Sequence, residues 1–326
     1  MNNGNRDFLK GKSSNNCYST SAVIHRSVDL SVTNSLPGSG ILYNDKSAFR
    51  FHIKIICIMV LYNPDDRIMA SVNSIVELVD RIYLVDNSLS PSPYLEELAS
   101  DPIIGSNILL IENHENVGLG RALNTGVNKI LADDSSSFIL LLDQDSIVNK
   151  SVLREILFKL TTRWQDNIGI VGLSAKNRNR TSEPRFTRVD RHITSGSIIN
   201  PKVFQKVRFR EDFFVDMVDV EFCYEVRRLG YDILEYTEQA LDHRLGLTKW
   251  KFNYEPHFRL YYMIRNSTVM LKERHLGILV FLKWNLLFSL ASVIGNGPMS
   301  TASAIFYGVV DALSNRLGKC QRPLSM

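Results

Sequence analysis

Hydrophobic residues in the first half of the chain form short continuous runs, separated by stretches with helical periodicity. The runs cover residues 53–61, 82–86, 108–111 and 138–142. A continuous apolar run is typical of a strand buried on both faces of a sheet. After the first run, Ile68, Val72 and Ile75 recur at helical spacing. This alternation predicts an α/β fold with a mostly parallel, Rossmann-like sheet flanked by helices.

The remaining connections are predicted from the same patterns. A turn-rich piece holds Pro91 and Pro93, and a further helix is expected to start at residues 116–118. The second half of the chain predicts, in order, a helix at 152–160, a strand at 168–173, an arginine-containing polar loop at 178–191, a segment at 193–200 without an assigned element, an acidic stretch near Asp216, a helix ending near Gly230 and a strand at 231–236.

The C-terminal part is strongly apolar. Residues 276–294 contain a narrow polar stripe formed by Asn285, Ser289, Ser292 and Asn296 at helical spacing. A second amphipathic helix is expected beyond Pro298. Lys283 lies in the first helix, and a lysine in the middle of a membrane span costs about 3 kcal/mol. We therefore expect interfacial rather than spanning helices at residues 276–326, although packing on the main domain is the alternative.

Residues 1–50 are rich in Asn and Ser and contain no apolar segment resembling a secretory signal. We expect a poorly ordered extension there, with an upstream over-extension of the reading frame as the alternative. The expected organisation is an extension at 1–50, a catalytic domain at 51–275 and amphipathic helices at 276–326.

The bulk properties exclude some classes of function. The 326 residues are 44% hydrophobic and 22% charged, which is enough for a packed core. The net charge of +4 is too small to indicate a nucleic-acid partner, but it suits an anionic cofactor or an anionic membrane face. The four cysteines have no metal-ligand spacing, so neither a zinc site nor a disulfide framework is expected, and a reducing compartment is favoured.

Two predicted strands end in acidic residues. Asp86 closes one apolar run, and Asp143, followed by Asp145, closes another. The carboxyl ends of parallel strands form the ligand-binding edge of such a sheet. Carboxylates there can bind Mg²⁺ or Mn²⁺, which bridge to substrate phosphates. A D-x-D pair alone is weak evidence because acidic pairs are common on surfaces, so its place at a strand end carries the prediction.

Three further segments carry candidate chemistry, each with a structural alternative. Arg121 lies in a glycine-containing loop that opens a helix but lacks the spacing of a dinucleotide motif, and it would meet a phosphate or lie on a solvated face. A partly buried carboxylate among Asp216, Asp219 and Glu221 would serve as a general base, unless these residues only complement a helix dipole. His243 would be a third metal ligand or a structural histidine.

Taken together and in order, these segments resemble glycosyltransferase family 2, which has the GT-A fold, and most closely its bacterial O-antigen rhamnosyltransferases. The resemblance covers about residues 53–318. Its matching pieces are residues 61–63, 84–88, 116–118 with Ala122 and 124–126, 143–146, 194–197, 215–223, 243–246 and 261–266. One departure is Glu225, where the family often has arginine.

The resemblance implies roles for individual positions. Tyr62 and Asp86 would contact the base and ribose of a nucleotide sugar, Asp143 would meet the ribose or the metal, and Arg265 would hold the diphosphate. Asp145 and His243 would bind the metal, and Asp219, with Glu221 nearby, would be the catalytic base. The matched positions expected to complete the nucleotide-sugar site are Asn63, Asn116, Gly118, Arg121 and Asn124.

The reaction implied is direct displacement with inversion, in which a sugar, expected to be L-rhamnose from dTDP-L-rhamnose, moves to a glycan on polyprenyl diphosphate. Such an enzyme would work in the cytoplasm, on the inner face of the bacterial cell membrane. A different nucleotide sugar, a nucleotidyltransferase and an inactive membrane-associated binding module are the alternatives. The first strand is not followed by the basic glycine-rich loop that a nucleotidyltransferase normally has.

Overall fold

The structure is a computed structural model. It describes residues 53–102, 104–163, 165–175, 184–242, 247–249, 252–254 and 256–322. The predictions for residues 1–50 and for His243 therefore concern parts of the chain outside the described residues.

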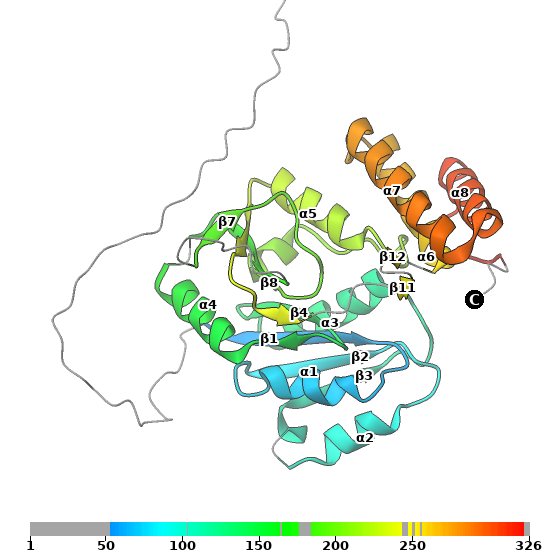
Figure 1. Cartoon of the computed structure of the whole chain (residues 1–326). Helices are drawn as coiled ribbons and strands as arrows, with labels where there is room; N and C mark the ends of the chain where they lie inside the picture. The colour runs from blue at the N-terminus through cyan, green and yellow to red at the C-terminus, as the bar shows by residue number, and fades with distance from the viewer. Residues whose placement is uncertain are drawn as a thin grey trace, which may run out of the picture.

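An eight-stranded sheet forms the centre of the molecule (Figure 1). Its strands are β1 (Ile55–Leu61), β2 (Arg81–Asp86), β3 (Ile108–Glu112), β4 (Phe138–Asp143), β6 (Ile168–Leu173), β7 (Phe186–Arg188), β8 (Ser197–Ile199) and β9 (Asp232–Tyr236). Their order is β3-β2-β1-β4-β8-β6-β9-β7. Neighbouring strands from β3 to β4 are parallel, as are β6 and β9, whereas β8 and β7 run antiparallel to their neighbours. The predicted α/β fold with a mostly parallel sheet is confirmed.

Helices cover both faces of this sheet. They are α1 (Arg67–Ile75), α2 (Pro93–Ser100), α3 (Leu119–Asp133), α4 (Lys150–Arg163) and α5 (Val218–Arg228), with short 3-10 turns at η1 (Gly105–Asn107) and η2 (Pro201–Gln205). One core contains residues of α1, α2 and α4, and the other contains residues of α3 and α5. Alternate residues of β1 enter the two cores, Cys57 and Met59 into one and Ile56 and Ile58 into the other, because side chains alternate along a strand.

The register of the parallel strands places the acidic strand ends on one edge. Leu61 of β1 pairs with Asp86 of β2, and Val60 pairs with Asp143 of β4. Two short ladders lie outside the main sheet, and they join β5 (Ile147–Val148) to β10 (Leu241–Asp242) and β11 (Leu247–Lys249) to β12 (Phe252–Tyr254). Asp86 and Asp143 thus lie on the two strands that flank β1.

Residues 193–200, for which the sequence pattern predicted no element, contain β8, and the residues before it turn, with a positive φ of 81° at Gly196. The piece expected to be turn-rich after Pro91 instead forms α2, with Pro93 in its first turn, where a proline is preorganised for helix.

Three helices close the chain and lie together at one end of the molecule (Figure 1). They are α6 (His257–Lys272), α7 (Ile278–Asn296) and α8 (Pro298–Leu313), and α6 packs against both of the others. Among the described helices, α7 has the length and apolar composition to cross a membrane, with a mean hydropathy of 1.9. One such helix is weak evidence for a membrane span.

The polar stripe of α7 faces the protein. Asn285 accepts a hydrogen bond from Ser267 of α6 at 3.2 Å, and Ser292 accepts one from Thr301 of α8 at 3.0 Å. The apolar side chains face outward instead, and Leu279 is 79% exposed. The outward face, which we call the α7 apolar face, consists of Ile278, Leu279, Leu282, Leu286, Leu287, Leu290, Val293 and Ile294.

Candidate active site

The turn after β4 is held in place by its neighbours. The guanidinium group of Arg67 donates to the carbonyl oxygen of Asp145 at 2.9 and 3.2 Å. Ser195 accepts a hydrogen bond from the backbone N–H of Asp143 at 3.0 Å and donates one to Ser146 at 2.8 Å. The 143–146 and 194–197 segments therefore form one hydrogen-bonded unit at the edge of the sheet.

Gln144, between the two aspartates, holds the end of β1. Its side-chain oxygen accepts from the N–H of Tyr62 at 2.8 Å, and its side-chain nitrogen donates to the carbonyl oxygen of Tyr62 at 3.3 Å. The ring of Tyr62 remains 48% exposed at the rim of the site. Gln144 therefore fixes the backbone of Tyr62, while Asp143 and Asp145 line the space beside it.

A cavity of about 560 Å³ opens at this edge, and it is called the donor cavity because several residues expected to bind a nucleotide-sugar donor line it. Its wall includes residues from the ends of β1, β2 and β4, the start of α3, the loop before α5 and the start of α6. Its lining residues include Tyr62, Asn87, Asn116, Gly118, Asp143, Asp145, Asp216, Asp219 and Arg259. Five binding or metal residues expected from the sequence lie together here, namely Tyr62, Asn116, Gly118, Asp143 and Asp145.

The segment before α5, residues 213–217, has an unusual backbone. Phe214, Asp216 and Met217 have positive φ values of 65°, 58° and 62°, which cost energy in residues other than glycine. The side-chain nitrogen of Asn266 contacts the carbonyl oxygens of Phe213, Val215 and Asp216 at 2.9 to 3.0 Å. Such strain persists only where surrounding contacts over-determine the conformation, and here it points Asp216 into the cavity wall.

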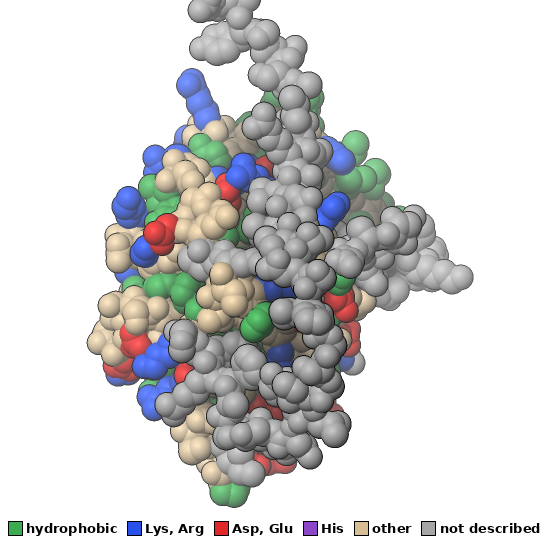
Figure 2. Space-filling model, turned by 90° about the vertical axis from the view of Figure 1, so that its left-hand side faces the viewer, with side chains coloured by type: hydrophobic (Ala, Val, Ile, Leu, Met, Phe, Trp, Pro, Cys, Tyr) green, Lys and Arg blue, Asp and Glu red, His purple; other side chains and the backbone are tan. Residues whose placement is uncertain are grey.

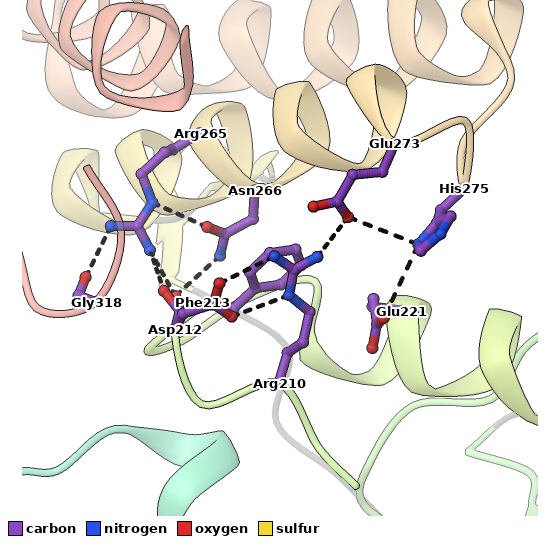
Figure 3. Close-up of polar contacts among 9 residues, drawn as sticks. All are labelled: Arg210, Asp212, Phe213, Glu221, Arg265, Asn266, Glu273, His275 and Gly318. Carbon is purple, nitrogen blue, oxygen red and sulfur yellow. Dashed lines mark hydrogen bonds and ion pairs between the residues drawn. The ribbon is translucent and has the colours of Figure 1, made fainter. Parts of the chain in front are cut away.

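Arg265 supports the same segment from behind (Figure 3). It is 1% exposed, and its guanidinium group donates to the carbonyl oxygens of Phe213 at 2.8 Å and Gly318 at 2.7 Å. The sequence-based expectation was a contact with the diphosphate. The structure instead places Arg265 between the strained segment and the C-terminal residues, away from the wall of the donor cavity.

Among the described arginines, Arg259 lines the donor cavity. Its Nε lies 3.2 and 3.3 Å from the two carboxylate oxygens of Asp216, and both residues line the donor cavity. The sequence analysis did not identify Arg259. It lies on the first turn of α6, just before the matched segment 261–266, so its closeness to that segment was the available signal.

Asp219 lies at the start of α5, where two cavities meet. It lines the donor cavity and also a second cavity of about 500 Å³, called the acceptor cavity because the expected catalytic base would meet an acceptor hydroxyl there. Burial raises the pKa of Asp219 from an ordinary 3.8 to about 6, and the nearby negative charges of Asp216 and Asp143 act in the same direction. A carboxylate with such a pKa can accept a proton near neutral pH.

The acceptor cavity is lined partly by α7. Trp284 and Phe288 come from this helix, and Arg191 lies over the Trp284 ring with its guanidinium carbon 4.1 Å from the ring centroid. Burial lowers the pKa of Arg191, although the charge of Asp219 opposes that shift. A cavity with an aromatic wall and a guanidinium group suits a ligand that is partly apolar and partly anionic or hydroxylated.

Several residues expected in the site lie behind its walls. Asp86 is 3% exposed and accepts from the N–H of Ser88 at 2.9 Å, so its neighbour Asn87 lines the donor cavity instead. Asn124 is buried and bonds to the backbone of Phe209 at 2.9 and 3.0 Å. The expected residues outside the wall of the donor cavity are Asn63, Asp86, Arg121, Asn124, Glu221 and Arg265.

Glu221 follows Asp219 on α5 but has different surroundings. It lines neither cavity, is 4% exposed, and its Oε1 atom lies 3.9 Å from Nδ1 of His275. Burial raises the pKa of Glu221 to about 7. The structure therefore does not bring Glu221 to the place where Asp219 would act.

The donor cavity has ligands of the right kind for a divalent cation. Asp143 and Asp145 contribute carboxylates to one wall, and Mg²⁺ and Mn²⁺ prefer oxygen ligands. The negative charge gathered there, which contributes to the raised pKa of Asp219, also favours a cation. These residues fit such an ion, and His243, the other expected ligand, lies outside the described residues.

Figure 2 shows how charged side chains are distributed on one face of the molecule. The Lys and Arg side chains visible among the described residues there are scattered among acidic, polar and apolar ones. Among the described residues, ion pairs such as Lys202 with Asp166 at 2.9 Å neutralise part of the positive charge. This arrangement differs from the continuous basic stripe of many nucleic-acid-binding surfaces.

Comparison with solved structures finds the same fold elsewhere. A structure of S. aureus TarS residues 1-349 in complex with UDP-GlcNAc is similar with a TM-score of 0.53 and 14% identity, over 80% of this chain and 81% of that chain. A further S. aureus TarS structure has a TM-score of 0.48 and 14% identity over 67% of this chain, which spans 39% of it. At such identity the likeness shows the fold alone. None of the curated proteins compared with the chain matches it.

The family comparison covers the site itself. The family described as Glycosyl transferase family 2 matches residues 56–228, more than half of the chain. This range includes the ends of β1, β2 and β4, the 213–217 segment and Asp219. The chain therefore belongs to glycosyltransferase family 2.

Proposed function

We propose that the protein is an inverting glycosyltransferase that moves L-rhamnose from dTDP-L-rhamnose to a glycan carried on polyprenyl diphosphate. It would act at the cytoplasmic face of the bacterial cell membrane, in the synthesis of O-antigen or another surface polysaccharide. The observation that carries this proposal is the position of Asp219, which lines the donor cavity and the acceptor cavity at once.

The donor would bind with its nucleotide between Tyr62, Asn116 and Gly118. Asp143 and Asp145 would hold Mg²⁺ or Mn²⁺ beside the diphosphate, and this ion would neutralise charge on the departing nucleoside diphosphate. Arg259, which lines the same cavity, would meet the diphosphate while it keeps its contact with Asp216.

The chemical step needs one proton acceptor and one displacement. Asp219 removes the proton of an acceptor hydroxyl, whose oxygen forms a bond to the anomeric carbon. The bond from that carbon to the diphosphate oxygen breaks, and dTDP leaves with the bonding electrons. Attack from the side opposite the leaving group inverts the anomeric centre, so a β-L-rhamnosyl donor gives an α-L-rhamnoside. Arg265 and Asn266 serve this step indirectly, by fixing the segment that leads into α5.

The acceptor side favours a lipid-linked substrate. Trp284 and Phe288 line the acceptor cavity from α7, and the other side of the same helix is the α7 apolar face. In this proposal α7 contacts the membrane through its apolar face. A glycan whose lipid carrier lies in that membrane could then reach Asp219 beside α7. We accordingly propose residues 51–275 as the catalytic domain and 276–326 as a membrane-associating unit.

A donor screen tests the proposal. The full chain is incubated with Mn²⁺, a lipid-linked acceptor and one of several nucleotide sugars, and release of the nucleoside diphosphate is measured. We expect the fastest release from dTDP-L-rhamnose, and its loss in Asp219→Asn. Release from no donor would favour an inactive binding module.

A second donor class belongs in the same screen. The similar TarS structure was solved with UDP-GlcNAc. Faster release from UDP-GlcNAc than from dTDP-L-rhamnose would keep the transferase proposal and overturn the rhamnose assignment.

A further inference from the structure

A second group of ionisable side chains lies beyond the active site, where α5 meets the corner between α6 and α7. It consists of Glu221 and Glu225, one turn apart on α5, and His275 in the corner. One potential ligand atom from each residue lies within 4.8 Å of the others. Figure 3 shows Glu221 and His275 turned toward one another, with Glu273 beside them. We call Glu221, Glu225 and His275 the α5–corner cluster.

The distances within the α5–corner cluster are too long for hydrogen bonds. His275 lies 3.9 Å from Glu221 through Nδ1 and 3.9 Å from Glu225 through Nε2. Two ligand atoms bound to one ion at about 2.1 Å are roughly 3.0 to 4.2 Å apart. The two 3.9 Å contacts involve different ring nitrogens, and one ligand atom from each of the three residues lies within 4.8 Å of the others, so a small inward shift would bring them to the spacing of groups around one ion.

Two buried atoms in the cluster lack a hydrogen-bond partner. Oε2 of Glu221 and Nδ1 of His275 are buried without a hydrogen bond among the described residues, and Glu221 is 4% exposed. An unpartnered buried polar atom is costly, and a buried carboxylate is costlier. The ring of His275 is held by stacking on Tyr224, with centroids 4.3 Å apart, so it does not readily turn away.

Nearby arginines do not neutralise this cluster, because other acids engage them. Arg210 pairs with Asp212 at 2.9 Å and with Glu273 at 2.5 Å. Arg228 bonds to Oε2 of Glu225 and leaves Oε1 of that residue facing His275. Burial raises the pKa of Glu221, and the charge of Arg210, which acts from nearby and lowers that pKa, has the weaker effect.

We propose that Glu221, Glu225 and His275 bind a divalent transition-metal cation such as Zn²⁺, at a site separate from Asp143 and Asp145. An imidazole nitrogen with two carboxylates is a ligand set that Zn²⁺ accepts and that Mg²⁺ does not favour. The ion would fasten α5 to the α6–α7 corner. The ion would act as a structural clamp on α5. Because Asp219 lies half a turn earlier on the same helix, the clamp would also hold Asp219 in place.

The test measures metal binding rather than activity. The full-length double variant Asp143→Asn/Asp145→Asn removes the proposed donor-site ligands, and Zn²⁺ retention is measured by equilibrium dialysis and elemental analysis. We expect one equivalent at micromolar free Zn²⁺. Adding His275→Gln or Glu221→Gln should weaken retention by at least about tenfold. Adding His114→Gln or Glu238→Gln, which change the same residue types elsewhere, should not.

Thermal unfolding gives a second measurement. Zn²⁺ at a hundredfold excess over its Kd should raise the unfolding midpoint of the double variant by roughly 5 °C, and His275→Gln should abolish that rise. No bound Zn²⁺ at micromolar concentration overturns the proposal. Retention unchanged by both cluster substitutions also overturns it.

Discussion

Two carboxylates on α5 differ in chemistry because they face different surroundings. Asp219 meets the two cavities, whereas Glu221 points toward His275. Both have raised pKa values, mainly through burial. A raised pKa alone would not distinguish a base from a structural acid, so the cavities decide which residue can touch a substrate.

Asp219→Asn should lose turnover and keep donor binding. Removing a general base lowers rates by about 10² to 10⁴-fold, so we expect kcat to fall within that range while donor Kd changes little. In the unaltered protein, kcat should rise with pH through about 6, because the base must lose its proton. Steady-state kinetics from pH 5 to 8 would check both points, and an unchanged kcat would move the role to Asp216.

The same substitution should stabilise the fold at neutral pH. The pKa of Asp219 is higher in the folded protein, about 6, than its ordinary 3.8, so the folded state holds more protons between these values. Stability contributed by this group therefore falls as pH rises from about 4 to 6. Asp219→Asn should raise the free energy of unfolding by about 1 to 2 kcal/mol at pH 7 and have little effect at pH 4. Urea unfolding at the two pH values measures this difference, and equal stability at pH 7 would contradict it.

At the residue scale, the sequence predicted the acidic residues that line the site better than its basic and amide residues. Asp143, Asp145 and Asp219 all line the donor cavity, where strand ends and a helix start place them. Arg265 and Asn124 look equally suited to a ligand, but their partners come from segments 52 and 85 residues away. Such pairings depend on tertiary packing, which local sequence patterns do not encode.

At the scale of elements, the start of α3 and the strained segment before α5 depend on each other. The N–H of Leu119 donates to the carbonyl oxygen of Phe214, and Gly118 has a φ of 89°. A Cβ atom at Gly118 would lie 2.7 Å from Cδ2 and 2.8 Å from the carbonyl oxygen of Phe214. Glycine is therefore required here for both its conformation and its size.

Gly118→Ala should destabilise the protein by roughly 2 to 4 kcal/mol, since it adds a clash to the backbone strain. Gly230→Ala is the matched control, because Gly230 has a φ of 87° but nothing within 4 Å of the added carbon. It should cost about 1 kcal/mol through strain alone. Urea unfolding measures both, and equal losses would show that the contact with Phe214 contributes nothing.

The buried strands and most helices could be predicted because their signals are local. Continuous apolar runs marked β1, β2, β3, β4 and β6, and helical spacing marked α1 and α3. The antiparallel strand β8 has three residues and is defined by its neighbours β4 and β6. So short an element carries no periodicity of its own, and its limits could not be read from the sequence.

At the scale of the whole molecule, α7 joins the active site to the outer surface. Its polar stripe is directed inward and its leucines outward, which is the reverse of a helix in a soluble protein. The sequence showed the stripe, but only the packing of α6 and α8 shows which side of the helix is covered.

Replacing Leu282, Leu286 and Leu290 together by Gln should reduce membrane binding. These three side chains are 54%, 61% and 55% exposed, so the fold should tolerate the change. Each leucine buried in a membrane contributes about 1.5 kcal/mol or more, so partitioning onto anionic vesicles should fall by a hundredfold or more. Flotation measures this, with Phe158→Gln, at a 49% exposed position on α4, as the control. Unchanged flotation of the triple variant would contradict membrane contact by α7.

The link between Gln144 and Tyr62 has a thermodynamic consequence. The side chain of Gln144 holds the backbone of Tyr62 through two hydrogen bonds, and Gln144 lies between Asp143 and Asp145. An ion that draws the two aspartates into one arrangement would also settle the position of Tyr62, so a nucleotide arriving later would find its contact already ordered. The coupling must be reciprocal: whatever factor the ion adds to nucleotide affinity, the nucleotide adds to ion affinity. Gln144 would then set the cooperativity with which the ion and the nucleotide bind.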